Sequence, residues 1–296
     1  MPNRLPEHAH LVAEYVEPYR GGRLTSGQVE RFRRVVWSYY RAARRPMPWR
    51  ETRDPYRIMV SEFMLQQTQV SRVEPRYHEF IARYPTVFEL ATAPLGEVLR
   101  SWQGLGYNRR AKHLHETARR IAERGGIVPD EVRELRTLPG IGPYTAAAVA
   151  AFAFDRRVVV LETNIRRLFL HGFFPDAQGV SDREIEPLVE QTLPERGVRQ
   201  WYYALMDCGA ALAGMVGNAN RRSRHYSRQS SFSGSVREVR GMIVRVLSEH
   251  AEVPLETLER AIGPTDERFR PALEGLERDG MVVVSGRSVS LGESSP

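Results

Sequence analysis

The segment LPGIGPYT, residues 138–145, is the strongest local signal in this sequence. Gly140 and Gly142 stand in a short turn between a helical segment and an alanine-rich helix over Tyr144–Phe154. Glycines at such a turn let backbone N–H groups approach an anion without a Cβ atom in the way. The segment predicts a hairpin that can bind a phosphate, although ordinary interhelical turns also use this pattern.

On both sides of this hairpin the sequence has a helical pattern. From about residue 27 to 137, apolar residues recur at spacings of three and four, as at Val29 and Phe32, which is typical of amphipathic helices. The pattern continues over 164–170 and 182–206. We therefore expect a body made of helices.

The C-terminal region differs in composition. Residues 217–234 are dominated by Arg, Ser, Asn and Gly and predict a basic linker. After it come three helical segments and a short strand hairpin, which predict a small winged-helix domain: 236–250, 255–261, 269–279, 281–284 and 288–291. Such domains bind DNA or protein, and the sequence leaves both open.

Charge and composition limit the class of protein. The 296 residues include 43 Lys plus Arg against 36 Asp plus Glu, so the formal net charge is +7 and a polyanionic partner is plausible. No run reaches the ~18 apolar residues of a membrane span, and the N-terminus lacks the apolar stretch of a signal peptide. We expect a cytoplasmic, nucleoid-associated protein with no membrane contact. Cys208 is the only cysteine, which excludes an internal disulfide.

Several motifs in order resemble one known family. They are MPWR (47–50), DPY (54–56), SEFMLQQTQV (61–70), GLGY (104–107) and the hairpin LPGIG (138–142). From about Met47 to Gly217 the chain resembles the helix-hairpin-helix DNA glycosylases, and among them the MutY-like adenine glycosylases. The resemblance implies a mainly α fold with two helical lobes, a small C-terminal winged-helix-like domain, and a DNA-repair enzyme.

Two carboxylates carry the implied chemistry. Glu62 lies where the adenine glycosylases keep their catalytic Glu, in an apolar, amide-rich helix segment where a lone carboxylate is costly unless paired or functional. An apolar pocket would raise its pKa, so that it protonates the departing base and then activates water. The family also keeps an Asp eighteen residues after the position of Tyr144, and this sequence has Glu162 there. Its longer arm departs from the family pattern, and Asn164 matches an Asn of the adenine enzymes.

Tyr144 occupies the position where bifunctional relatives carry a Lys that attacks the sugar. Because tyrosine cannot form a Schiff base, we expect base excision without strand cleavage.

The remaining site residues are expected to contact DNA. An enzyme that extrudes a base must fill or brace the gap in the stack, and Gln67 and Tyr107 match the family positions that do so. The predicted DNA-binding set comes from the helix end, the GLGY motif and the hairpin: Gln66, Gln67, Thr68, Tyr107, Leu138, Gly140, Ile141, Gly142 and Thr145.

The family's iron–sulfur cluster is expected to be absent. Its ligands follow the pattern Cys-x6-Cys-x2-Cys-x5-Cys, and the four positions hold Ala213, Asn220, Ser223 and Gln229 here. None of these can bind iron, so we expect no cofactor and no metal. Cys208 is expected to be a buried packing residue.

The expected domains follow from these motifs. They are N-terminal helices that pack with the second lobe (1–55), a lobe containing the hairpin (56–160), a second lobe without cluster ligands (161–216), the basic linker (217–234) and the winged-helix-like domain (235–296).

Three functions stay open. The first is a monomeric, monofunctional glycosylase that removes adenine opposite guanine or oxidised guanine in double-stranded DNA. The second is a glycosylase for uracil, thymine or a modified pyrimidine in mispairs. The third is a noncatalytic DNA-binding protein on a glycosylase scaffold, which the presence of Glu62 disfavours.

Overall fold

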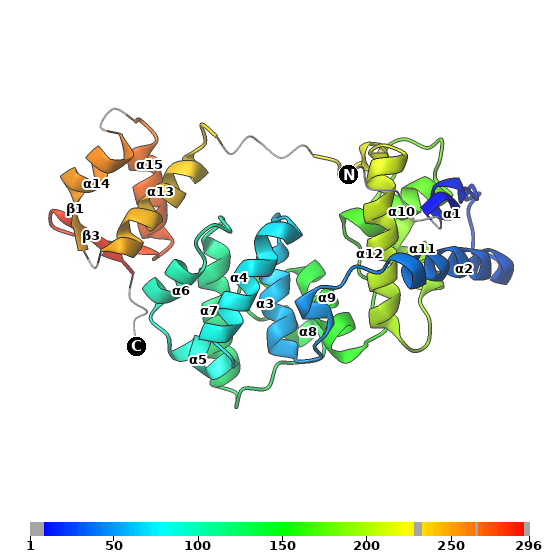
Figure 1. Cartoon of the computed structure of the whole chain (residues 1–296), viewed down its shortest axis with the longest axis horizontal. Helices are drawn as coiled ribbons and strands as arrows, with labels where there is room; N and C mark the ends of the chain where they lie inside the picture. The colour runs from blue at the N-terminus through cyan, green and yellow to red at the C-terminus, as the bar shows by residue number, and fades with distance from the viewer. Residues whose placement is uncertain (1–8, 228–232, 251, 264–265, 293–296) are drawn as a thin grey trace. The chain divides into compact units, whose positions relative to one another are not determined.

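The computed structural model describes residues 9–227, 233–250, 252–263 and 266–292, and these residues are mainly helical (Figure 1). The predicted mainly α fold class is confirmed. The chain forms two compact units. The first unit comprises residues 1–53, 130–132 and 143–228, and the second comprises 54–129, 133–142 and 229–296.

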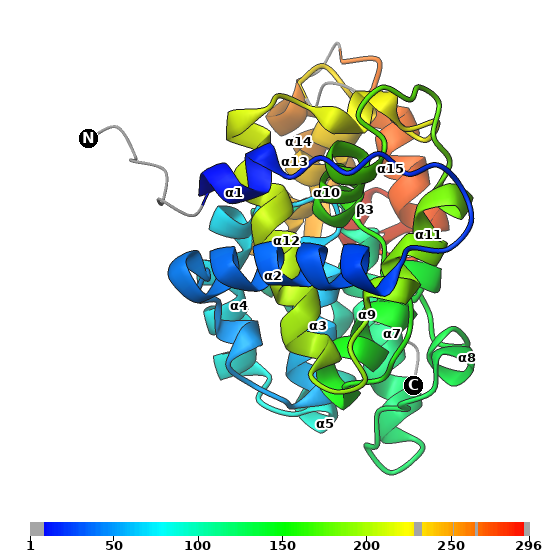
Figure 2. The same ribbon diagram turned by 90° about the vertical axis from the view of Figure 1, so that its right-hand side faces the viewer.

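The first unit consists of helices from both ends of its sequence range. They are α1 (Ala9–Glu14), α2 (Ser26–Ala43), η1 (Pro48–Arg50), α9 (Pro143–Phe154), α10 (Thr163–Phe173), α11 (Asp182–Thr192), α12 (Val198–Met215) and η2 (Ala219–Arg222). Helix α2 lies across α12 (Figure 2), and α12 also packs against α10. Rings of Phe32, Phe169 and Trp201 meet in the buried core between these helices.

Helix α9 belongs to the first unit, whereas its position before residue 160 predicted that it joins the lobe with the hairpin. The helix is apolar on all sides, and residues Thr145 to Phe152 are buried. Because it packs against α12, its apolar surface is covered within the first unit.

The second unit contains the helices between Asp54 and the hairpin. They are α3 (Pro55–Leu65), α4 (Val70–Arg83), α5 (Val87–Thr92), α6 (Leu95–Ser101), α7 (Arg109–Ala122) and α8 (Val132–Leu135), of which α8 begins at the border of the first unit. Helix α7 packs against α3, α5 and α6. The fully buried Phe80 and Trp102 form the aromatic centre of this core.

The C-terminal part of the second unit has the predicted winged-helix arrangement. It contains α13 (Val236–Glu249), β1 (Glu252–Pro254), α14 (Leu255–Ile262), α15 (Phe269–Arg278), β2 (Val282–Ser285) and β3 (Ser288–Leu291). The three strands are antiparallel in the order β1-β3-β2, with Val253 opposite Val289 and Val289 opposite Val284. We call residues 235–291 the winged-helix module. Strand β1 is an addition to the predicted elements.

Part of the segment that predicted a linker has a defined structure. Residues 219–222 form η2, and Ser223 pairs with Val180 in a parallel bridge. Residues 228–232 of this segment, including Gln229, lie outside the described residues. Within the described parts of the chain, no helix has the length and apolar character needed to cross a membrane.

Candidate active site

Glu62 lies on the buried helix α3 of the second unit. Helix α3 begins at Pro55 because Asp54 caps it, its side chain accepting from Tyr56 N at 2.9 Å. Eight of the eleven residues of α3 are buried, and Glu62 is only 5% exposed. Among the acids of the described residues, only Asp207, at 1%, is less exposed. A buried carboxylate on an apolar helix has the environment that a general acid requires.

Arg110 holds the end of α3 in place. Its Nη1 donates to the carbonyl oxygens of Phe63 and Met64 at 2.9 and 2.8 Å, and to Gln66 O at 2.6 Å. Its Nη2 donates to Thr68 Oγ1, Leu105 O and Gly106 O at 3.0 to 3.1 Å. Burial lowers the pKa of Arg110 to about 10. One guanidinium therefore joins the Glu62 helix to the two loops that carry Gln67 and Tyr107.

Gln67 and Tyr107 have unusual backbone conformations. Their φ angles are 54° and 50°, and only Asp155 shares this left-handed conformation among the described non-glycine residues. Such conformations are strained and concentrate at functional sites. Gln67 is exposed and Tyr107 is half-buried. Both residues fit a role in bracing the DNA stack. Their left-handed backbone conformation could not be predicted from the sequence.

The hairpin turn presents its backbone rather than its apolar side chains. Leu138 and Ile141 are 3% and 5% exposed, whereas Gly140 and Gly142 are exposed. Gly140 has φ 70°, and a Cβ there would lie 2.6 Å from the Cβ of His113, so glycine is required. Thr117 Oγ1 on α7 fixes the turn by donating to Pro139 O at 2.8 Å. Any phosphate contact of this turn is therefore made by main-chain N–H groups.

Tyr144 and Thr145 follow this turn on α9 in the first unit. Tyr144 is half-buried and Thr145 is 3% exposed. Both are in the first turn of α9, and Tyr144 has no amine with which to attack a sugar carbon.

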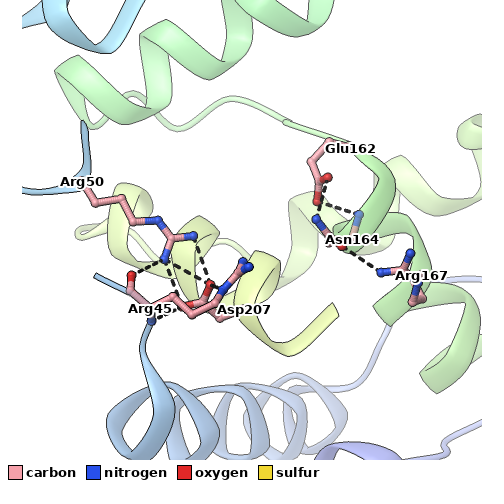
Figure 3. Close-up of polar contacts among 6 residues, drawn as sticks. All are labelled: Arg45, Arg50, Glu162, Asn164, Arg167 and Asp207. Carbon is pink, nitrogen blue, oxygen red and sulfur yellow. Dashed lines mark hydrogen bonds and ion pairs between the residues drawn. The ribbon is translucent and has the colours of Figure 1, made fainter. Parts of the chain in front are cut away.

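Glu162 and Asn164 form one hydrogen-bonded group at the start of α10 (Figure 3). Glu162 is the N-cap: its Oε1 accepts from Asn164 N at 2.7 Å and from Ile165 N at 2.8 Å. Burial raises the pKa of the Glu162 carboxyl, although these two N–H groups and the nearby Arg167 and Arg166 act in the opposite direction. The first unit thus contains a partly desolvated carboxylate with fixed orientation.

Arg167 supports this group from the next turn. Its Nη1 donates to Asn164 Oδ1 at 2.8 Å and to Gly209 O at 2.7 Å (Figure 3). Gly209 on α12 is essential to this packing, since a Cβ there would lie 2.0 Å from Asn164 O. The segment MDCGA (206–210) therefore brings α12 against the start of α10. Cys208 is fully buried, as predicted, and its Sγ faces Val36 O at 3.7 Å.

A second charged group of the first unit was missed by sequence reasoning. The Asp207 carboxylate is fully buried and accepts from Arg45 Nε at 2.7 Å and from both terminal nitrogens of Arg50 at 3.0 to 3.1 Å (Figure 3). Beside it is a cavity of about 200 Å³, lined by five arginines with Tyr40, Tyr203, Gln200 and Glu51. Guanidinium donors with aromatic rings suit phosphates and stacked bases. The motif MPWR contained the signal, but its partner Asp207 is far away in sequence.

Two of the four family ligand positions, Asn220 and Ser223, contact other parts of the protein. Asn220 is 6% exposed, and its Nδ2 donates to Thr163 O at 3.1 Å. Ser223 takes part in the bridge to Val180, and Arg222 Nη1 donates to Phe174 O at 3.1 Å. Ala213 lies on α12, and Gln229 is outside the described residues. These side chains do not fit an iron–sulfur cluster, and hydrogen bonds attach the loop to α10 and its neighbours.

The site residues are divided between the two units. The second unit holds Glu62, Gln66, Gln67, Thr68, Tyr107, Leu138, Gly140, Ile141 and Gly142, and the first holds Tyr144, Thr145, Glu162 and Asn164. Within the second unit, Arg110 connects the Glu62 helix with the Gln67 and Tyr107 loops. Within the first unit, Glu162 and Asn164 are in direct contact.

Comparison with known proteins identifies the family of this chain. A model of the HhH-GPD superfamily of base excision DNA repair proteins matches residues 60–195, which include both carboxylates and the hairpin. The chain is 38% identical over 277 residues to the adenine DNA glycosylase of Mycolicibacterium smegmatis, covering 86% of this chain and 94% of that relative. The chain therefore belongs to the HhH-GPD superfamily. This membership makes the chain a DNA glycosylase. The predicted family is confirmed.

Two solved structures share the fold. A thermostable thymine-DNA glycosylase matches with a TM-score of 0.55 at 27% identity, over 66% of this chain and 90% of that one. An endonuclease III in a noncovalent DNA complex matches with a TM-score of 0.52 at 20% identity, over 62% of this chain and 85% of that one. The predicted helix-hairpin-helix glycosylase fold is thereby confirmed.

Proposed function

We propose that this chain is a monofunctional DNA glycosylase of base excision repair that removes adenine mispaired with guanine or oxidised guanine. The observation that carries the proposal is the match to an adenine DNA glycosylase over 94% of that relative's length, with Glu62 buried on α3. One chain supplies both carboxylates and both stack-bracing residues, which supports action as a monomer.

The two carboxylates divide the chemistry. Glu62 in its acid form donates a proton to the adenine ring as the bond between the base and the sugar breaks, and its carboxylate then accepts a proton from the attacking water. The sugar passes through an oxocarbenium-like state, whose positive charge the Glu162 carboxylate stabilises. Asn164 Nδ2 donates to Glu162 Oε2 at 3.1 Å and so fixes its orientation. The products are free adenine and an abasic sugar that carries the water's hydroxyl.

Tyr144 supports a reaction that stops at this product. A lyase needs an amine that forms a Schiff base with the sugar, and the residue at this position is a phenol. The intact abasic strand would then break only under added alkali.

The absence of a cluster is also part of the proposal. The four family ligand positions hold residues that do not bind iron, and Asn220 donates into the protein at Thr163. We therefore infer that these hydrogen bonds replace the structural role of the cluster.

A thymine glycosylase is the second candidate, because the structure with a TM-score of 0.55 is a thymine-DNA glycosylase. A panel of duplexes separates the candidates. Each duplex carries one target base, with adenine opposite guanine, adenine opposite oxidised guanine, thymine opposite guanine or uracil opposite guanine, and is treated with alkali after incubation. Cleavage of the adenine strand with wild-type protein, lost in Glu62→Gln, supports the proposal. Cleavage only at thymine or uracil would replace it with the second candidate.

A further inference from the structure

The winged-helix module contacts the rest of the second unit through a small charged group around Asp279. The Asp279 carboxylate, just after α15, accepts from Arg109 Nη2 at 2.8 and 2.9 Å and is also paired with Arg240 on α13. Its backbone oxygen accepts from Lys112 Nζ at 2.6 Å. Arg109 and Lys112 belong to α7, the helix that begins two residues after Tyr107.

A second contact of the module reaches Tyr107 itself. Arg237 on α13 donates from Nη1 to Tyr107 Oη, and its guanidinium lies over the ring with 5.1 Å to the centroid. The guanidinium of Arg110 also lies over this ring, at 5.4 Å. The half-buried ring with a left-handed backbone is therefore held by one arginine from each part of the unit.

The charge of the winged-helix module does not suit a domain that binds DNA by itself. Residues 235–291 contain eight arginines, no lysine and ten acidic residues, whereas the whole chain has a formal net charge of +7. Helix α15, at the position of a recognition helix, carries Arg270 and Arg278 against Glu274 and Glu277, all exposed. Binding of the DNA backbone needs an excess of positive charge on the contacting face.

We propose that the winged-helix module holds Tyr107 in place and that Arg237 is the positioning residue for this ring. Holding the ring in one conformation before DNA arrives lowers the ordering cost of placing it in the stack. The inference rests on the proposed function, because it assigns Tyr107 to the DNA stack of a glycosylase. Arg237 acts through Tyr107 and need not touch the excised base.

A double-mutant cycle of Arg237→Ala and Tyr107→Phe tests whether Arg237 positions Tyr107. Single-turnover excision at saturating enzyme and urea unfolding without DNA are both measured for wild type, each variant and the double variant. We expect Arg237→Ala to slow excision about 10-fold, a loss in the range of small misplacements, with binding of an undamaged duplex within two-fold of wild type. The double variant should be no slower than the slower single variant. Arg245→Ala, an exposed arginine on the same helix, is the matched control and should excise at the wild-type rate.

Each outcome of the double-mutant cycle either supports or overturns the positioning role of Arg237. Rate losses that multiply in the double variant, or a wild-type rate for Arg237→Ala, would overturn the positioning role. The two substitutions could instead be coupled in the free energy of unfolding but independent in the excision rate. The contact would then be only structural, and the positioning role would also be overturned. If wild-type protein excised no base from the panel, the proposed function would fail separately, while the unfolding cycle would still show whether Arg237 holds Tyr107. Arg237→Lys should recover most of the rate, because an ammonium keeps both the donor and the charge over the ring.

Discussion

The Glu162 carboxylate caps its own helix and is hydrogen-bonded to Asn164 twice, from the backbone N–H at 2.7 Å and from the side-chain amide at 3.1 Å. The family Asp is one methylene shorter, and here the longer arm turns back onto the start of α10. Glu162 is extended at φ −123° and ψ 179°, so the backbone needs no strained conformation to allow this. The start of α10 thus fixes the carboxylate through the N–H groups of Asn164 and Ile165.

Shortening or neutralising this side chain should slow excision. Glu162→Gln removes the negative charge and should cost about 3 kcal/mol of transition-state stabilisation, which is roughly 100-fold in rate. Glu162→Asp should lose about 10 to 100-fold, because the shorter side chain moves the carboxylate by about an ångström from the position that Asn164 and Ile165 fix. Single-turnover kinetics measure both effects, and Glu184→Gln at the start of α11 is the control. A full rate for Glu162→Gln would make this carboxylate merely structural.

Burial at Glu162 should also appear in the pH dependence of stability. Its pKa is raised by desolvation, while Arg167, Arg166 and two backbone N–H groups oppose the rise. A raised pKa means that the native state binds the proton more tightly than the unfolded state, so this contribution is present at acidic pH. It is lost as pH rises from the usual Glu range, near 4.3, through the higher native pKa. Urea unfolding should show Glu162→Gln gaining on wild type from pH 4 to pH 7. A difference independent of pH would contradict this.

Tyr144 should determine the reaction product. Borohydride should trap no covalent adduct with wild-type protein, because Tyr144 cannot form a Schiff base. Tyr144→Lys supplies the missing amine and should yield a trapped adduct on denaturing gels, while Tyr144→Phe should not. Trapping of wild-type protein at the efficiency of a true lyase would refute monofunctional chemistry.

The loop over 219–223 should be stable without iron. Purified protein should be colourless, contain no stoichiometric iron by elemental analysis, and unfold at the same urea concentration with and without an iron chelator. Asn220→Ala should lower the free energy of unfolding by about 1 kcal/mol, since it removes the hydrogen bond to Thr163 O. Arg221→Ala, at an exposed position of the same loop, is the control. Stoichiometric iron would contradict the loop assignment.

The sequence predicted those parts of the site that depend on local patterns. Glycine at residue 140 indicates a left-handed turn, and a carboxylate within the apolar helix around Glu62 is unusual. Both signals lie within a few neighbouring residues. The helix and strand ranges of the winged-helix module also follow from local periodicity. Its strand β1 did not, because three residues give too little pattern and depend on pairing with β3.

Long-range contacts were out of reach of such patterns. Arg110 is one of several arginines on α7, and its role follows only from the folding of three segments around its guanidinium. Asp207 meets Arg50 across 157 residues, and Arg237 meets Tyr107 across 130. Side chains at such separations are paired by tertiary packing, for which a single sequence contains no periodic signal.

The proton donated by Glu62 is the central claim, and one comparison tests it most directly. Wild type and Glu62→Gln are mixed in excess with a duplex containing adenine opposite oxidised guanine, and adenine release is followed in a single turnover beside a gel-shift titration. The amide keeps the shape of the buried side chain but cannot supply the proton. We predict that Glu62→Gln binds the duplex within a few-fold of wild type and releases no measurable adenine. Adenine release by Glu62→Gln at the wild-type rate would contradict the claim.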